Sequence, residues 1–133
     1  MRYLLDTDIC IYLINGRPDS VTQTFRRHRI ASIGLSSITT SELRWGVAKS
    51  GSARNRTALE AFLASFQVAP YDDDAARAYG DLRAELERRG TPIGPLDLLI
   101  AAQAIALDTI LVSNNEREFK RVPGLRVENW TRG

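Results

Sequence analysis

Cysteine and histidine are almost absent from this 133-residue sequence, which holds one of each, Cys10 and His28. A single cysteine excludes an internal disulfide, and the two residues together are too few for a Cys or His metal site. Cys10 lies in an apolar run with no histidine beside it, so we expect a packed thiol and not a nucleophile. His28 lies in a basic segment of surface character, and we expect it to take no part in catalysis.

Long hydrophobic runs are also missing. No segment approaches the roughly 20 apolar residues of a membrane-spanning helix, and the first residues lack the pattern of a secretory signal. The composition, 44% hydrophobic and 26% charged, is that of an ordinary globular protein. We therefore expect no membrane contact and a cytoplasmic location. No linker or repeat divides the chain, which predicts one domain over residues 1–133.

Positive charge is concentrated in the first half of the chain, although the formal net charge is only +2. Residues 1–71 hold nine Lys or Arg against five Asp or Glu, whereas residues 72–133 hold nine against eleven. Clustered cations are the usual contact for nucleic-acid phosphates, but charge alone is weak support for such a partner. The candidates for RNA contact are Arg44, Lys49 and Arg117.

Short apolar runs alternate with segments of helical periodicity. Strands are predicted at 3–5, 30–37, 67–71, 109–113 and 126–130, and helices at 9–14, 21–29, 40–49, 53–65, 72–89 and 96–107. Helices between strands require crossover connections, which favour parallel pairing. The sequence therefore predicts an α/β fold with three layers, in which helices cover both faces of a central, mainly parallel sheet.

Acidic residues gather where such a fold binds ligands, beyond the carboxyl ends of the strands. Four of them follow predicted strands within a few residues. A fifth, Asp8, lies two residues after Asp6, and the sixth, Asp97, lies in the first turn of an apolar helix. In chain order they are Asp6, Asp8, Glu42, Asp97, Glu116 and Glu118.

Each principal acid also has a purely structural explanation. Asp6 is placed to cap a helix, Glu42 ends a T-x-x-E capping box that starts at Thr39, and Asp97 follows Pro95 in a first helical turn. Several desolvated carboxylates at one end of a sheet repel one another, however, and a divalent cation offsets that repulsion. Oxygen-only ligands favour Mg²⁺ or Mn²⁺.

Four motifs in order, LLDTDICI, ITTSEL, GTPIGPLDLLIAAQA and ILVSNNEREFKRVPGLRVENW, resemble the PIN-domain ribonucleases, in particular the VapC toxins of bacterial type II toxin–antitoxin modules. The resemblance implies a Mg²⁺-dependent endoribonuclease, with Mn²⁺ as a substitute, that leaves 5′-phosphates and 3′-hydroxyls. It implies that Asp6, Glu42 and Asp97 are catalytic metal ligands.

The resemblance leaves the fourth acid open. Glu118 is favoured, and Glu116 and Asn115 are the alternatives. Ser113, Asn115 and Asp8 are expected to be polar groups that orient the ligands or a phosphate, and Asp8 departs from the Asn that is common in the family.

The resemblance also implies partners. These are a VapB-type antitoxin that blocks the site, a second copy of the toxin, and an RNA substrate, with operator DNA contacted only through the antitoxin. The TPIGPLD and SNNEREF segments resemble enteric VapC toxins that cut the anticodon loop of initiator tRNA. A set of large apolar side chains either forms an exposed groove or dimer surface or fills the core: Trp45, Val47, Leu59, Phe62, Leu63 and Phe66.

Other protein classes share parts of this pattern. D-x-D after a strand is also typical of haloacid dehalogenase-like phosphotransferases, with Asp6 as nucleophile. That class, like receiver domains, requires a downstream lysine, and the only lysines here are Lys49 and Lys120. A non-catalytic PIN-like scaffold that binds RNA or protein is a third alternative, but such a scaffold has no use for a cluster of carboxylates.

Overall fold

A five-stranded parallel sheet forms the centre of the protein, in a computed structural model that describes residues 1–132. The strand order is β3-β2-β1-β4-β5, so β1 is the middle strand. The strands are β1 (Tyr3–Leu5), β2 (Ile33–Ser36), β3 (Gln67–Ala69), β4 (Ile110–Val112) and β5 (Arg126–Glu128). The helices are α1 (Thr7–Asn15), α2 (Asp19–Arg26), α3 (Ser37–Ser50), α4 (Ala53–Leu63), α5 (Asp73–Arg88), α6 (Pro95–Ala106) and α7 (Glu116–Phe119).

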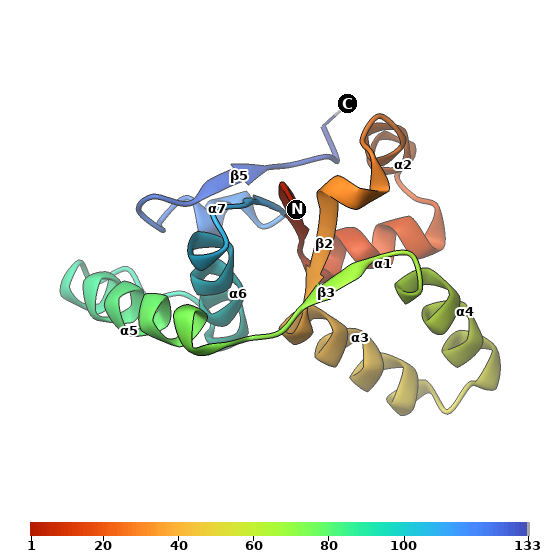
Figure 1. Ribbon diagram of the computed structural model, residues 1–133, viewed down its shortest axis with the longest axis horizontal. Coiled ribbons are helices and arrows are strands. Elements are labelled where there is room, and N and C mark those ends of the chain that lie inside the picture. The colour runs from red at the N-terminus through yellow and green to blue at the C-terminus, as the bar shows by residue number, and fades with distance from the viewer. Residues whose placement is uncertain (133) are drawn as a thin grey trace.

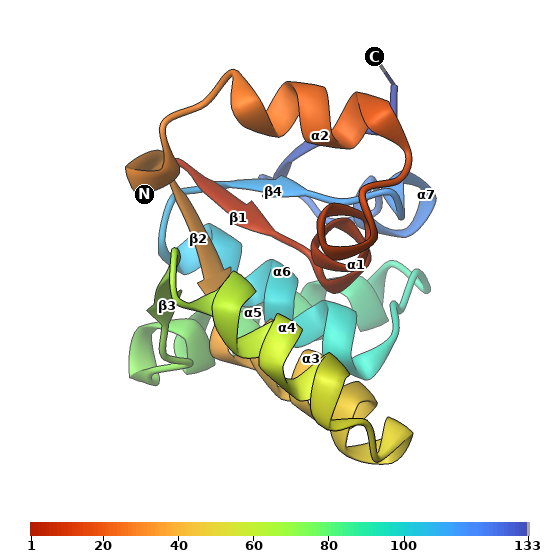
Figure 2. The ribbon, with the colours of Figure 1, turned by 90° about the vertical axis from the view of Figure 1, so that its right-hand side faces the viewer.

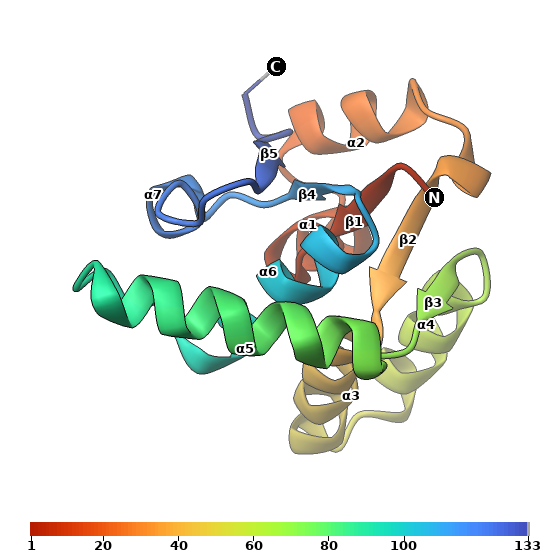
Figure 3. The ribbon, with the colours of Figure 1, turned by 60° about the vertical axis from the view of Figure 1, so that its left-hand side comes forward.

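Helices cover both faces of the sheet, as predicted. In Figure 1, α5 and α6 lie on one side of β1 and β2, and α1, α2 and α4 lie on the other. Figures 2 and 3 show that α3 and α4 lie side by side as a hairpin and that α5 packs along α6. Alternate residues of β1 face opposite layers, since Tyr3 and Leu5 pack with α1 to α4 while Leu4 packs with α5 and α6.

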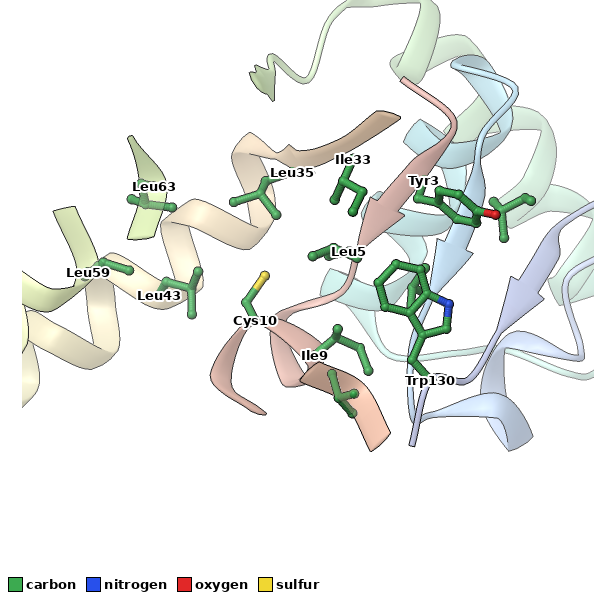
Figure 4. Packing of buried hydrophobic residues seen from close by; sticks show 13 residues of the cluster. Tyr3, Leu5, Ile9, Cys10, Ile33, Leu35, Leu43, Leu59, Leu63 and Trp130 are labelled. Carbon is green, nitrogen blue, oxygen red and sulfur yellow. The ribbon is translucent and has the colours of Figure 1, made fainter. Parts of the chain in front are cut away.

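The core between the sheet and helices α1 to α4 contains Cys10, which is fully buried (Figure 4). This confirms the predicted packed thiol. Leu59 and Leu63 of α4 are buried in the same core, and Val47, Phe62 and Phe66 pack against it. The core alternative is therefore right for most of the apolar set.

Trp45 is the exception in that set, because 65% of its surface is exposed. Its ring borders a groove of about 450 Å³ between α1, α3 and α4. The groove also contains Thr7 and Glu42, so it extends to the carboxyl end of β1.

Some local predictions differ from the structure, including a helix cap, the start of a strand and one helix. The T-x-x-E capping box is wrong, because α3 begins two residues before Thr39 and Ser36 caps it by accepting a hydrogen bond from the Ile38 amide. The predicted strand at 30–37 starts later, since Ile30–Ser32 form a 3-10 turn. The helix α7 was not predicted, because four residues are too few to show a periodic pattern.

None of the helices formed by residues 1–132 is both long and apolar enough to cross a lipid bilayer.

Candidate active site

The carboxyl ends of β1, β2 and β4 lead directly into the candidate site. Asp6 follows β1 and caps α1, accepting a 2.8 Å hydrogen bond from the Thr7 amide through Oδ1. Its other oxygen, Oδ2, accepts a 2.7 Å bond from the hydroxyl of Ser113, which follows β4. Because β1 and β4 are adjacent parallel strands, Asp6 and Ser113 meet at the same edge of the sheet. Asp6 is therefore both a helix cap and a member of the site.

Burial makes the charge on Asp6 costly. Asp6 is only 6% exposed, and this burial, together with the nearby charges of Asp8 and Glu42, raises its pKa to about 6. The hydrogen bonds from Ser113 and Thr7 act in the opposite direction but do not compensate. The environment thus favours a cation beside this carboxyl.

Glu42 enters from α3. The Thr7 hydroxyl donates a 2.6 Å hydrogen bond to Glu42 Oε1, which links the first residue of α1 to the second turn of α3. This contact joins residues 35 positions apart in the sequence. The structure therefore places Glu42 against the segment that carries Asp6, as the ligand prediction requires.

Asp97 and Glu118 face each other across the loop before α6. A β-carbon built at Gly94 would lie 3.4 Å from Glu118 Oε1 and 3.6 Å from Asp97 Oδ2, so both carboxyls approach the backbone there. The side-chain amide of Asn115 donates to Asp97 Oδ2 at 3.3 Å and to Glu118 Oε2 at 2.9 Å. The Gly94 amide also donates to Glu118 Oε1.

The two carboxyls have opposite pKa shifts. Burial, a hydrogen bond shared with Glu118 and the charges of Asp6, Glu118 and Glu42 raise the pKa of Asp97 to about 7. Burial acts in the same sense on Glu118, but the hydrogen bonds from Gly94, Asn115 and Asp97 and the charge of Arg121 outweigh it and lower the pKa of Glu118. In the absence of a cation, Asp97 is therefore the carboxyl of this pair that binds a proton more readily.

A continuous polar chain joins these groups. The backbone amide of Asn115 donates a 2.9 Å hydrogen bond to Ser113 Oγ, and the Ser113 hydroxyl in turn donates to Asp6. Asn115 and Ser113 thus connect Asp6 to Asp97 and Glu118 through hydrogen bonds. Glu116 lies outside this chain, since it pairs with Arg132 at 2.7 Å and accepts from Asn129.

Asp8 ties α1 to the loop after β4, because its Oδ2 accepts a 3.1 Å hydrogen bond from the Asn114 amide. Burial raises the pKa of Asp8, and its charge contributes to the raised pKa of Asp6. Asp8 therefore orients the loop that carries Ser113 and adds negative charge to the site.

The candidate RNA contacts differ in their surroundings. Arg44 forms an ion pair with Glu60 of α4, and Lys49 lies 5.0 Å from the centre of the Trp45 ring. Arg117 is exposed in α7 and lines a pocket with Glu118. Of the three, the structure places only Arg117 in a pocket with a predicted ligand.

The candidate ligands are carboxylate oxygens, which suit a hard cation such as Mg²⁺. In the conformation that residues 1–132 adopt, no three His, Cys, Asp or Glu side chains form a ready metal cage. Mg²⁺ does not require one, because it commonly keeps several waters and binds one or two protein carboxylates. Burial is the largest cause of the raised pKa values of Asp6 and Asp97, and neighbouring carboxylate charges add to it, so a bound cation would offset both effects.

Comparison with known protein families assigns the chain to one of them. Residues 3–125 match the sequence profile described as the PIN domain. The chain belongs to the PIN-domain family. The carboxylates described above therefore lie at the carboxyl ends of the strands of a PIN domain.

Two relatives of this PIN domain match it over nearly their whole length. It is similar to the tRNA(fMet)-specific endonuclease VapC of Salmonella typhimurium, with 40% identity over 131 residues and 98% of each chain covered. It is also similar to ribonuclease VapC2 of Rickettsia felis, with 44% identity over 132 residues and 98% of each chain covered.

Solved structures give the same result. DNA-bound VapBC from Salmonella typhimurium superposes with a TM-score of 0.90 and 40% identity, covering 98% of both chains. VapBC2 from Rickettsia felis, bound to a DNA fragment from its promoter, superposes with a TM-score of 0.87 and 42% identity, covering 98% of this chain and 99% of that one. These complexes confirm the predicted three-layer α/β fold.

Sequence reasoning missed two members of the site. Thr7 lies between the two acids of the D-x-D motif but was given no role, and it proves to bind Glu42. Gly94 binds Glu118 through its backbone amide, in a loop predicted only as a break between helices. A β-carbon at Gly94 would make only ordinary van der Waals contact with the two carboxyls, so the contact comes from the backbone amide and no signal for it was available in the sequence.

Proposed function

We propose that this PIN domain is a metal-dependent endoribonuclease toxin of the VapC type, which hydrolyses RNA phosphodiester bonds. The observation that carries the proposal is that Asp6 and Glu42 both bind Thr7, that Asp97 and Glu118 both approach Gly94, and that Ser113 and Asn115 link the two pairs by hydrogen bonds. The chain also matches named VapC ribonucleases over 98% of its length. Metal dependence is general among PIN-domain ribonucleases. We propose Mg²⁺ as the ion, with Mn²⁺ as a substitute.

In the proposed mechanism Asp6 and Asp97 hold the cation, Glu42 completes the cluster, and Glu118 orients the attacking water or a second ion. When bound, the cation supplies positive charge at the phosphoryl oxygens and makes water easier to deprotonate. Ser113 and Asn115 keep the carboxyls in place through the polar chain described above. No histidine or lysine is needed as a base, and His28 packs on Tyr3 and Trp130 near the start of β1, away from the site.

The proposed substrate is an RNA with an exposed single-stranded segment. The VapC relative in Salmonella typhimurium is named for tRNA(fMet), and we propose initiator tRNA as the first RNA to test. We further propose a VapB-type antitoxin and a second toxin copy as partners, with operator DNA reached through the antitoxin, because the neighbouring structures are VapBC complexes bound to DNA. A cytoplasmic location and a single domain over residues 1–133 complete the proposal.

The test is cleavage of total bacterial RNA by the purified protein with Mg²⁺ or Mn²⁺, beside an EDTA control, with fragment ends mapped. We expect discrete cuts that leave 5′-phosphates. Asp6→Asn and Asp97→Asn should each lower the rate by at least about a hundredfold, because loss of a metal ligand costs more than loss of a group that merely orients one. Asp81→Asn, an exposed acid of α5, is the matched control and should cleave like the parent protein.

Cleavage that survives EDTA, or an Asp97→Asn variant with parental activity, would contradict the proposal. Intact RNA in every lane, from protein shown to be folded and to bind the cation, would favour the scaffold or phosphotransferase alternatives.

A further inference from the structure

A pocket of about 360 Å³ opens directly beside the carboxylate cluster. Its lining includes Gly94, Asn115 and Glu118, which are joined by hydrogen bonds in the candidate site, and also Arg117 and Arg121. The pocket therefore joins the reacting centre to two guanidinium groups.

These two arginines stand apart from the other arginines in their half of the chain. Eight arginines follow residue 72, and within residues 1–132 six of them form ion pairs with Asp or Glu. The remaining two, Arg117 and Arg121, form no ion pair in the part of the chain that the structure describes. Both are exposed, so their donors remain available to a ligand.

Arg121 is also held in place. Its Nη1 donates a 3.1 Å hydrogen bond to the carbonyl oxygen of Pro92, in the loop that leads to Gly94. Its charge contributes to the lowered pKa of Glu118, which places the guanidinium close to the cluster. A guanidinium fixed in this way presents its remaining donors in the fork geometry that suits a phosphate.

The proposed substrate explains why cations are needed there. RNA is a polyanion, and a site rich in carboxylates repels it. A metal ion offsets this repulsion at the reacting phosphate only, so the neighbouring phosphates require positive charge from the protein.

We propose that Arg117 and Arg121 form a subsite for a phosphate next to the one that is cleaved, and so position the RNA strand across the site. This inference rests on the proposed ribonuclease function. Both arginines affect how tightly the RNA binds and which phosphate lies at the reacting centre, and neither takes part in the reaction itself.

The test uses a short oligoribonucleotide that carries a cleavage site mapped for the parent protein, at saturating Mg²⁺ and fixed salt. We expect Arg117→Ala and Arg121→Ala each to raise KM about tenfold with little change in kcat, the loss of one charge-assisted hydrogen bond. Arg117→Ala is the cleaner variant, because Arg117 makes no side-chain hydrogen bond within residues 1–132. Lys120→Ala removes the same charge from the adjacent position outside the pocket and should behave like the parent.

A modified substrate separates phosphate binding from a structural effect. Oligonucleotides with one neutral methylphosphonate, placed in turn at each linkage beside the cleaved one, should include one that raises KM about tenfold for the parent protein. The same methylphosphonate should not raise the KM of the Arg117→Ala, Arg121→Ala double variant any further, because that variant has already lost the contact with this phosphate. Arg117→Lys should recover part of the affinity, since lysine restores the charge but not the fork.

The subsite would be overturned if the KM increases from the double arginine variant and from the methylphosphonate simply multiplied. It would also be overturned if the KM were unchanged in both single arginine variants. Neither result would contradict the ribonuclease proposal. The second result is also the one expected if the pocket serves a protein partner. A parent protein that cuts no RNA would overturn the ribonuclease proposal and the subsite together.

Discussion

At the scale of single residues, the structural and functional explanations of Asp6 turn out to be compatible. One carboxylate oxygen caps α1 through the Thr7 amide, and the other faces Ser113 and the cluster. The D-x-D pattern after a strand was enough to predict the position of this acid. The role of Thr7 was not predictable, because its partner Glu42 is brought close only by the pairing of β1 with β2.

The repulsion within the cluster predicts a stability change in Asp97→Asn. Replacing the half-buried carboxyl with a neutral amide removes repulsion from Asp6, Glu42 and Glu118. We expect the metal-free variant to gain about 1 kcal/mol in the free energy of unfolding at pH 8, a value kept small by solvent screening. Urea unfolding in EDTA measures it.

Asp81→Asn is the control for that measurement, because it removes an exposed acid far from the cluster and should leave the free energy of unfolding unchanged. A metal-free Asp97→Asn protein less stable than the parent would show that Asp97 contributes more through its hydrogen bonds than it costs through repulsion.

At the scale of elements, the long helices and the strands followed from the sequence, whereas α7 did not. Periodic apolar positions with acids in the first turn identify α5, and a nearly all-apolar run after Pro95 identifies α6. A four-residue helix has no such pattern, yet α7 carries Glu118 and is fixed by Phe119, which is fully buried between the sheet and α6. The uncertainty between Glu116 and Glu118 in the sequence has the same origin, because only the orientation of α7 decides which of the two faces Asp97.

Removal of the Phe119 ring should therefore affect both stability and the site. We expect Phe119→Ala to lower the free energy of unfolding by about 3 to 5 kcal/mol, the usual cost of emptying a buried aromatic site. Lys120→Ala, at the next and exposed position, should change it by less than about 0.5 kcal/mol. Denaturant titration of both variants gives the comparison, and a Phe119→Ala cost as small as that of Lys120→Ala would contradict the anchoring role.

At the scale of the whole molecule, the sheet order explains how distant residues form one site. The middle strand β1 lies between β2 and β4, so the segments that follow all three strands share one edge. The alternation of strands and helices was sufficient to predict this parallel arrangement. The exact strand order and the pockets between helices were not predictable, because they depend on the packing of side chains far apart in the chain.

The charge of this edge predicts how the stability of the whole protein depends on pH. Without metal, Asp97 keeps its proton up to about pH 7, whereas in the unfolded chain it loses the proton near 3.8, and Asp6 behaves similarly with a pKa of about 6. The folded state thus binds more protons between these values, so its stability falls as the pH rises from 5 to 8. We expect the Tm in EDTA to fall over this range.

Saturating Mg²⁺ should reduce or abolish that fall, because a cation that binds the ionised carboxylates stabilises the folded state. Thermal unfolding at pH 5 and pH 8, with EDTA or Mg²⁺, provides the measurement. A Tm in EDTA that rises between these values would contradict the charge repulsion inferred for the site.

The spread of the carboxylates along the chain has a consequence for synthesis of the protein. The first lies at residue 6 and the last at residue 118, and the middle strand of the sheet is completed only when β4 pairs with it. A growing polypeptide therefore lacks the full set of candidate ligands until residue 118 has been added. On the proposed function, a fragment from translation that stops before residue 118 lacks one of the four candidate acids and is expected not to cleave RNA.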